Sequence, residues 1–473
     1  MKKIGIIFLP HANIQYSQLE PAKRGWVIKR SYEKILDIAT ELEVKMGFEA
    51  SGKTIEIMAE ETPDVLRKLR ASIKNGTIEP VASPNSHIML SNVSPEIGYY
   101  SLVMGLDTWE KYTGVRPVVG WNPECGWAYF MPDIFKKAGF RFLIMDWDSY
   151  ILSTIPGLRE KVGIKLDVSS HSNKNLLFKI YNHIKDRPEI LKTLYKPSEI
   201  TSGLYAIFRT DMLCNQMLWY LMGTPEEKRD RDVTPEEIRS SLLMWKEKIK
   251  DGDGFLMPYA EDAEYVGTTA YFYVKQFGIA RFFEEAPESV KRFVDLIKLA
   301  KELEFEFIFP TETVKRYGVI KGLPFNKIER GSAWHGGTAK AWENTIYSRI
   351  LDPVCDDIFE GIMTITKYLK LKTPMDDRVL KKALEYTIDG YVSDSRWPPA
   401  PTSPGRFNVC EAINALVSAN KELARVMKKH RIGKSLYSPD LIKTQIELIK
   451  NELMGMSYFG EKQQRSRIIQ YIV

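Results

Sequence analysis

Short apolar segments alternate with amphipathic, helix-like segments through the first two thirds of the chain. Seven of them have the length and composition of buried strands: 3–9, 44–50, 78–82, 118–122, 140–146, 203–209 and 254–260. Strands that are apolar on both faces and separated by helices are typical of a parallel sheet. The pattern therefore predicts a parallel α/β architecture. A further short segment at 306–309 leaves seven and eight strands equally compatible with the pattern.

The regular alternation is interrupted twice and then ends. Polar stretches at 154–202 and 225–250 read as insertions, the first of them over the mouth of a barrel. After residue 311 the strand pattern stops, and 378–389, 410–429 and 438–454 have helical periodicity. We therefore predict a barrel domain over 1–310 with two insertions, followed by a helical region over 311–473.

Composition limits the classes of function. Hydrophobic residues make up 44% of the 473 residues, which is enough for a large core. The net charge of +6 is spread over 67 basic and 61 acidic residues with no basic block, so nucleic acid is not expected as a partner. No apolar stretch reaches membrane-spanning length, so a membrane is not expected as a partner either. The apolar run at 4–9 is too short for a signal peptide, and we expect a cytoplasmic protein. The four cysteines lack metal-binding spacing and are expected to be free thiols: Cys125, Cys214, Cys355 and Cys410.

A carboxylate flanked by two tryptophans follows the fourth strand segment. Gly120 permits close backbone approach, and Pro123 ends the ladder, so Glu124 is expected just beyond the carboxyl end of the strand. Barrel enzymes keep their chemistry at that end. Trp121 and Trp127 could offer flat apolar faces to a sugar ring. Alternatively, Glu124 caps the helix that follows or makes a structural ion pair.

A second group of acids follows the seventh strand segment. Glu261, Asp262 and Glu264 fall within four positions, and like charges packed this closely raise one another's pKa. A carboxyl group that stays protonated near neutral pH can act as a general acid. The alternative is an acidic loop that faces solvent.

Three further side chains are candidates because of their places on the predicted strands. His11 follows the first strand, Glu79 lies inside the third, and Arg209 ends the sixth. A buried carboxylate needs a partner or a ligand, and an arginine can orient a carboxylate by a bidentate contact. Each also has a structural alternative. His11 could be a hydrogen-bonded structural histidine, Glu79 could form an inward ion pair with a lysine or arginine, and Arg209 could form a structural ion pair.

Six short segments of the sequence, in this order along the chain, resemble motifs of glycoside hydrolase family 57. They are His-Ala-Asn at 11–13, Gly-Thr-Ile-Glu-Pro at 76–80, Trp-Asn-Pro-Glu-Cys-Gly-Trp at 121–127, Phe-Arg-Thr-Asp at 208–211, Glu-Asp-Ala-Glu-Tyr-Val-Gly at 261–267 and Ser-Asp-Ser-Arg-Trp at 393–397. The first departs from the family, in which Gln-Pro usually follows the histidine. The resemblance implies an incomplete (β/α)7 barrel followed by a helical region. It also implies a retaining mechanism, with Glu124 as nucleophile and Asp262 as acid/base. The substrate-binding residues it suggests are His11, Glu79, Trp121, Arg209, Glu264, Asp394 and Trp397.

The resemblance predicts a retaining α-glycosidase or α-glycosyltransferase that acts on α-glucan, with an oligo- or polysaccharide as substrate. Three alternatives remain: an α-galactosidase or other exo-acting α-glycosidase, a catalytically silent sugar-binding protein, and a metal-dependent carbohydrate deacetylase. Homo-oligomerisation is compatible with the sequence.

No cofactor and no metal are expected. The chain has six histidines, none of them three or four residues from another, and only His11, His87 and Asp146 could share an ion. Phosphate-binding glycine loops and a serine nucleophile elbow are not found in the sequence.

Overall fold

The computed structural model describes residues 3–16, 19–165, 170–223, 233–274, 279–343, 345–396 and 407–455. It divides the chain into two compact units. The larger comprises Met1–Ile14, Ala22–Pro84 and Met89–Ala339, and the smaller comprises Gln15–Pro21, Asn85–Ile88 and Lys340–Val473.

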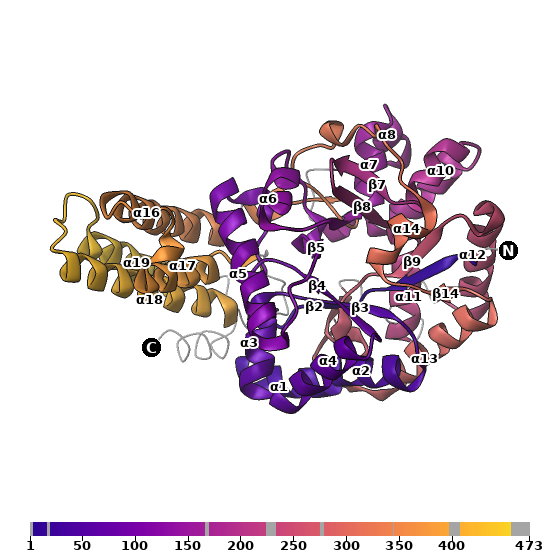
Figure 1. Cartoon of the computed structure of the whole chain (residues 1–473), viewed down its shortest axis with the longest axis horizontal. Coiled ribbons are helices and arrows are strands. Elements are labelled where there is room, and N and C mark those ends of the chain that lie inside the picture. Colours follow the sequence, from indigo (N-terminus) through magenta and orange to yellow (C-terminus); the bar gives the residue numbers. More distant parts are fainter. Residues whose placement is uncertain are drawn as a thin grey trace. The chain divides into compact units, whose positions relative to one another are not determined.

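The larger unit is built around seven parallel strands in its described residues (Figure 1). They are β1 (Gly5–Phe8), which continues as β2 (His11–Ala12), β3 (Met46–Ala50), β4 (Ile78–Ala82), β5 (Val119–Trp121), β6 (Phe142–Asp146), β8 (Leu204–Arg209) and β9 (Phe255–Tyr259). β1 pairs with β9, and β2 pairs with β3. The first strand therefore lies between the last barrel strand, β9, and the second, β3. The seven strand segments predicted from the sequence are confirmed.

The barrel is incomplete because no pairing joins β8 to β9 in the described structure. The Arg209 side chain spans this opening instead, with Nε donating to the Ala260 carbonyl at 3.1 Å. The outer edge of β8 carries the antiparallel strand β7 (Ser198–Thr201). The segment near residue 306 is the two-residue strand β14 (Glu306–Phe307), which pairs with the start of β1 and does not close the barrel. The predicted incomplete (β/α)7 barrel is therefore confirmed.

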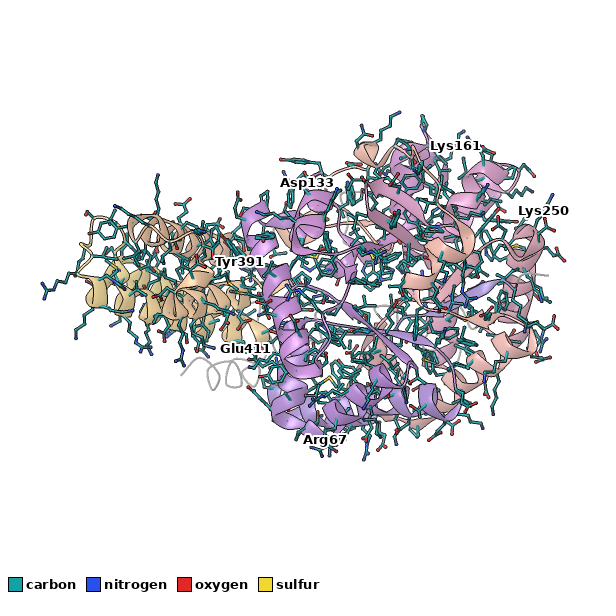
Figure 2. The ribbon with its side chains drawn as sticks, viewed as in Figure 1. Arg67, Asp133, Lys161, Lys250, Tyr391 and Glu411 are labelled. Atoms are coloured by element: carbon teal, nitrogen blue, oxygen red, sulfur yellow. The ribbon has the colours of Figure 1, made fainter. Side chains whose placement is uncertain are left out.

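Helices connect the strands and cover their outer faces; α2, α4 and α13 lie along the outside (Figure 1). In chain order the connecting helices are α1 (Arg24–Arg30), α2 (Tyr32–Glu41), α3 (Gly52–Glu61), α4 (Pro63–Lys74), α5 (Pro95–Thr113), α6 (Met131–Ala138), α7 (Trp147–Thr154), α11 (Asp211–Met222) and α13 (Pro287–Glu302). Charged side chains such as Arg67, Asp133, Lys161 and Lys250 are exposed on this unit (Figure 2).

The two predicted insertions contain short elements of their own. The first carries α8 (Leu158–Val162), α9 (Ile180–Ile184), α10 (Pro188–Leu194) and β7, and the second carries α12 (Pro235–Lys248). Residues 166–169 and 224–232 of these segments lie outside the described part. Beyond β9, short antiparallel pairs are formed by β10 (Gly267–Thr268) with β13 (Glu285–Ala286), β11 (Tyr271–Val274) with β12 (Ile279–Phe282), and β15 (Ser332–Ala333) with β16 (Gly337–Thr338).

The predicted domain boundary after residue 310 differs from the division in the structure, which falls between Ala339 and Lys340. Residues 311–339 stay with the barrel because Tyr317 and Trp334 pack into its buried core. The hairpin β15–β16 in this segment is too short to give a strand pattern in the sequence.

The smaller unit is helical. It contains α15 (Lys340–Glu343), α16 (Ile346–Tyr368), α17 (Arg378–Gly390), α18 (Phe407–His430) and α19 (Pro439–Gly455). The last three match the helices predicted from the sequence within a few residues. None of the helices in the described part of the chain is long and apolar enough to cross a membrane.

Close packing at Gly120 gives a test of the barrel core. A Cβ atom at this position would lie 2.7 Å from Phe135 Cε1 and 3.0 Å from Phe140 Cδ1. We expect Gly120→Ala to lower the melting temperature, with a cost of about 1–3 kcal/mol because the aromatic rings must move. Thermal unfolding followed by circular dichroism measures this. An unchanged melting temperature would show that the two rings are not fixed by the core.

Candidate functional site

Glu124 sits in a turn that follows β5 and is clamped by Trp334. The turn, η3 (Pro123–Cys125), holds Glu124 in a left-handed conformation with φ 57° and ψ 14°. The Trp334 backbone N–H donates to the Glu124 carbonyl at 2.9 Å, and the indole Nε1 donates to the carboxylate Oε2 at 2.6 Å. Left-handed backbone at a non-glycine residue is strained and is found preferentially at functional sites. The N-cap of α6 is Phe130, so Glu124 does not cap that helix.

Trp121, Trp334 and His11 form one aromatic cluster beside Glu124. The His11 ring stacks on Trp121 with centroids 5.2 Å apart, and it forms a T-shaped pair with Trp334 with centroids 6.0 Å apart. Trp121 is completely buried and Trp127 nearly so. Neither tryptophan therefore presents an open face for sugar stacking in this structure. Trp121 packs into the barrel core, although it stands at the end of its strand.

His11 is held by a buried carboxylate that the sequence analysis did not single out. Its Nδ1 bonds Glu49 Oε2, and both residues are buried at paired positions of β2 and β3. Burial alone would lower the pKa of His11, but the charge and hydrogen bond of Glu49 outweigh burial and raise it to about 9. His11 is therefore an imidazolium at neutral pH. The position of Glu49 near the carboxyl end of the predicted strand 44–50 is the sequence signal that could have identified it.

The loop after β9 brings Asp262 and Glu264 to the same cluster. Asp262 is bridged to His11 by parallel strand pairing, and it is only partly buried. Glu264, in the turn η7 (Ala263–Tyr265), is completely buried and accepts from the Asn13 backbone N–H at 2.9 Å and from the Tyr32 hydroxyl. Burial, reinforced by the charge of Asp262, raises the pKa of Glu264 to about 8. The alternative of an acidic loop that faces solvent therefore does not apply to Glu264.

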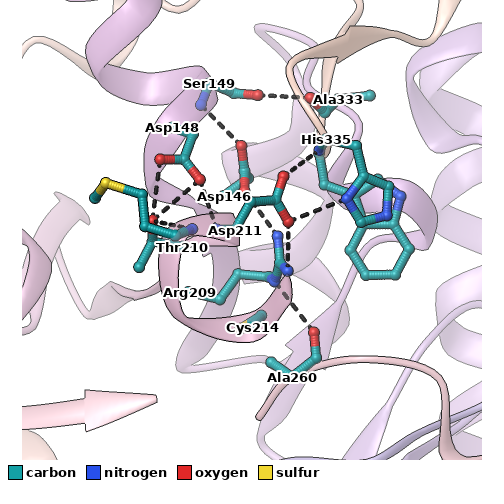
Figure 3. Close-up of polar contacts among 12 residues, drawn as sticks. Asp146, Asp148, Ser149, Arg209, Thr210, Asp211, Cys214, Ala260, Ala333 and His335 are labelled. Atoms are coloured by element: carbon teal, nitrogen blue, oxygen red, sulfur yellow. Dashed lines mark hydrogen bonds and ion pairs between the residues drawn. The ribbon is translucent and has the colours of Figure 1, made fainter. Parts of the chain in front are cut away.

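Arg209 lies at the centre of a buried ion network (Figure 3). Its guanidinium donates to Asp146 Oδ1 at 2.9 Å, to Asp211 Oδ1 at 2.7 Å and to Glu261 Oε1 at 2.6 Å, in addition to the Ala260 carbonyl. All of these ionisable side chains are buried. Arg209 thus fixes acidic side chains from three strand ends, which is the structural ion pair weighed as an alternative, and its assignment as a substrate-binding residue is not supported by these contacts.

Asp211 connects this network to the loop that carries Trp334. Its Oδ2 accepts the His335 backbone N–H at 2.6 Å, and its Oδ1 lies 3.0 Å from His335 Nδ1 (Figure 3). His335 has φ 60°, a strained conformation in the turn between β15 and β16. The guanidinium of Arg209 also lies over the Trp334 ring, 5.0 Å from its centroid. Arg209 and Asp211 therefore hold the Trp334 loop against Glu124.

The network mixes ionised and protonated carboxyl groups. Burial raises the pKa of Asp146 to about 7, and burial likewise raises that of Glu261 to about 7. Burial favours the neutral form of Asp211 too, but Arg209 and His335 reverse this and hold its pKa well below the usual range. Burial lowers the pKa of His335 to about 4, so this ring is neutral at pH 7. One arginine cannot keep every surrounding acid charged.

Two groups in this network have donor atoms close enough for a metal ion, within 4.8 Å of one another. They are Asp211 with Glu261 and His335, and Asp146 with Asp148 and Asp211. The first is already bonded to the Arg209 guanidinium at Asp211 and Glu261, and the second at Asp146 and Asp211. A metal ion would place a second positive charge against this guanidinium, so the residues do not fit a metal.

Three residues were candidates to share a metal ion: His11, His87 and Asp146. Of these, His11 is bonded to Glu49, and Asp146 is bonded to Arg209. His87 belongs to the smaller unit, where its Nδ1 lies 2.9 Å from Ser393 Oγ and 3.8 Å from Asp394 Oδ2. Asp394, predicted to bind substrate, therefore contacts His87 within that unit. Trp397, predicted to bind substrate beside it, lies outside the described residues.

Glu79 is misplaced by the sequence analysis. It lies near the amino end of β4, paired with Gly47 and two residues before the position that pairs with Glu49. Its carboxylate accepts from the Thr311 backbone N–H at 3.2 Å and from the Thr311 hydroxyl. Chemistry in such barrels is kept at the carboxyl ends of the strands, so Glu79 belongs to the floor of the barrel. The motif identified the strand correctly, but not the depth of the side chain.

Proton binding by the buried network predicts how stability depends on pH. Asp146 and Glu261 titrate near 7 in the folded protein but near 4 when unfolded, so the folded state binds extra protons between these values. The free energy of unfolding should therefore fall as the pH rises from about 4 to about 7, by on the order of 1–3 kcal/mol per group. Asp146→Asn, which keeps an oxygen for Arg209, should flatten this fall.

Urea unfolding of the intact protein at several pH values between 4 and 8 measures the effect. Asp133→Asn, at an exposed position on α6, is the matched control and should keep the wild-type slope. Equal slopes in wild type and Asp146→Asn would contradict the assignment.

Comparisons with known proteins agree with this fold. The chain is 26% identical over 151 residues to a 4-alpha-glucanotransferase from Thermococcus litoralis, covering 31% of this chain and 22% of that protein. It is 25% identical over 127 residues to an alpha-amylase from Pyrococcus abyssi, covering 26% of this chain and 19% of that protein. The matched stretches thus span about a fifth of each curated relative. The solved structure of a GH57-type branching enzyme from Pyrococcus horikoshii has the same fold, with a TM-score of 0.63 and 13% identity over 95% of this chain and 96% of that one.

The family model of glycosyl hydrolase family 57 matches residues 7–321, which include the end of β1, the strands from β2 to β9, the Glu124 turn and the Asp262 loop. The chain belongs to glycosyl hydrolase family 57.

Proposed function

We propose that this protein is a retaining α-glycosidase or α-glycosyltransferase acting on α-glucan, with Glu124 as nucleophile and Asp262 as acid/base. The observation that carries the proposal is the approach of both residues to one cluster. Glu124 is bonded to Trp334, Asp262 is paired with His11, and the rings of His11 and Trp334 are in contact. Both acids are partly exposed, whereas Glu49, Glu261 and Glu264 are buried. The printed names of the curated relatives, alpha-amylase and 4-alpha-glucanotransferase, support α-glucan as the substrate.

In the first step, Glu124 attacks the anomeric carbon while Asp262 gives its proton to the departing glycosidic oxygen. A glycosyl-enzyme ester forms on Glu124, and the leaving sugar departs as an alcohol. Asp262, now a carboxylate, then removes a proton from water or from a sugar hydroxyl, whose oxygen displaces Glu124. The Trp334 indole bond fixes the direction of the nucleophile before the substrate arrives. For a retaining pair, the two carboxyl groups are expected about 5–5.5 Å apart.

We further propose that His11 and Glu264 bind sugar hydroxyl groups, and we keep Asp394 and Trp397 as candidates from the smaller unit. Product analysis on maltooligosaccharides, glycogen and an aryl α-galactoside, side by side, tests the substrate class. Shortened or rearranged α-glucans among the products support the proposal. If the aryl group is released from the α-galactoside and the α-glucans are unchanged, the substrate is an α-galactoside instead. Sugar binding without turnover would indicate a silent protein. Activity that a chelator abolishes would favour a deacetylase.

The two carboxylates should respond differently to removal. Glu124→Ala loses the covalent route, so turnover should fall by several powers of ten on every substrate. Asp262→Ala keeps the nucleophile, so an activated aryl α-glycoside should still form the glycosyl-enzyme, which then accumulates because the second step has lost its base. Azide needs no base and should rescue Asp262→Ala by forming an α-glycosyl azide.

Nuclear magnetic resonance of the azide product reads the roles directly. With Glu124→Ala, azide should give the β-azide or no product. A β-azide from Asp262→Ala and an α-azide from Glu124→Ala would exchange the roles, and near-native turnover in both variants would place the chemistry elsewhere.

The Trp334 indole bond gives a second prediction. Trp334→Phe keeps an aromatic ring against His11 and Arg209 but removes the N–H donated to Glu124 Oε2. We expect kcat to fall about 10- to 100-fold, because a hydrogen bond to a charged group contributes about 1.5–3 kcal/mol. Steady-state kinetics on the best α-glucan substrate measures it. Trp245→Phe, on α12, is the buried-tryptophan control; equal effects of both changes would show only a loss of packing.

A further inference from the structure

Glu49 is a buried acid that the proposed mechanism does not use and that none of the sequence motifs contains. It belongs to the strand segment Met46–Ala50, in which all five residues are buried. A carboxylate in such a strand costs free energy unless it is paired. Its partner is His11, at the directly opposed position of β2.

The pairing with His11 leaves Glu49 incompletely satisfied. Oε2 bonds the imidazole, but Oε1 is buried and has no hydrogen-bond partner among the described residues. The same is true of Glu264 Oε2 and of Trp121 Nε1. Trp121 stacks on the His11 ring, and the charge of Glu264 contributes to raising the pKa of His11. Unsatisfied buried polar groups are rare and indicate a functional constraint or a bound molecule. Three of them surround one histidine.

We propose that Glu49 is a positioning residue of the sugar site, which fixes the His11 ring and keeps it cationic so that it binds substrate hydroxyl groups beside Asp262. This inference rests on the proposed function. The groups facing His11 include Glu49 from β3, Asp262 and Glu264 from the loop after β9, and the rings of Trp121 and Trp334. Glu49 is the acid directly bonded to Nδ1, so it orients the ring as well as charging it.

A merely structural Glu49 would behave differently from a positioning one. Neutralising it removes a buried charge with an unpaired oxygen, and His11 can then lose its proton, so folding should be little affected. Substrate binding and turnover should suffer, since the imidazolium is lost. Glu79→Gln is the control because Glu79 is a partly buried acid on the neighbouring strand β4, but at its amino end and bonded to Thr311.

The experiment compares wild type, Glu49→Gln, Glu79→Gln, His11→Gln and the double variant Glu49→Gln/His11→Gln. Histidine proton resonances are titrated against pH, with the His11 signal identified by its absence in His11→Gln. We expect Glu49→Gln to shift the His11 titration from about 9 to below 7 and to lower kcat/KM about 10- to 100-fold. The melting temperature should stay within a few degrees of wild type. Glu79→Gln should keep both the titration and the kinetics.

The double variant separates positioning from other effects. If Glu49 acts through His11, adding Glu49→Gln to His11→Gln should change kcat/KM by less than about twofold. An unchanged His11 titration in Glu49→Gln would overturn the proposal, as would a shifted titration with unchanged kcat/KM or fully additive losses. Failure of the proposed function is distinguishable, because wild type would then lack turnover while its His11 still titrated near 9. In that case, affinity for maltooligosaccharides measured by calorimetry replaces kcat/KM, and equal affinities in wild type and Glu49→Gln overturn the Glu49 proposal.

Discussion

The buried guanidinium of Arg209 is the interaction on which the rest of the site depends. The barrel is open between β8 and β9, and this side chain spans the opening through the Ala260 carbonyl. The same cation holds acids from the ends of β6, β8 and β9. A buried charge is stable only when hydrogen-bonded partners surround it, so Arg209 and its acids form one unit. An incomplete barrel thus obtains a fixed rim without an eighth strand.

Contacts from that rim fix the position of the candidate nucleophile. Asp211 holds the strained turn at His335, and the preceding Trp334 holds Glu124, which is itself strained. On the other side, Glu49 holds His11, whose backbone is paired with Asp262. Each partly exposed acid is therefore backed by a buried partner. This arrangement preorganises both groups, which is the main way in which proteins accelerate reactions of charged intermediates.

The sequence predicted the strands and their chemistry-bearing ends well, because a buried parallel strand leaves a clear apolar segment. It predicted Glu124, Asp262 and His11 near one another for the same reason. It did not predict that Glu79 lies near the amino end of its strand or that Trp121 is completely buried, since a motif says which strand a residue belongs to but not how deep its side chain lies. It did not single out Glu49 or Tyr32 for the site, and it did not predict the bond from Trp334 to Glu124. These residues reach the site through pairings of segments far apart in the chain, such as Trp334 with Glu124.

The central claim is that Glu124 forms the covalent bond to the sugar. Incubation with 5-fluoro-α-D-glucosyl fluoride should trap that ester, because the fluorine slows its hydrolysis more than its formation. Peptide mass spectrometry then locates the label. The account predicts one fluoroglucosyl group on the peptide that contains Glu124, and none in Glu124→Ala. A label on Asp262, Glu264 or any other residue would contradict it.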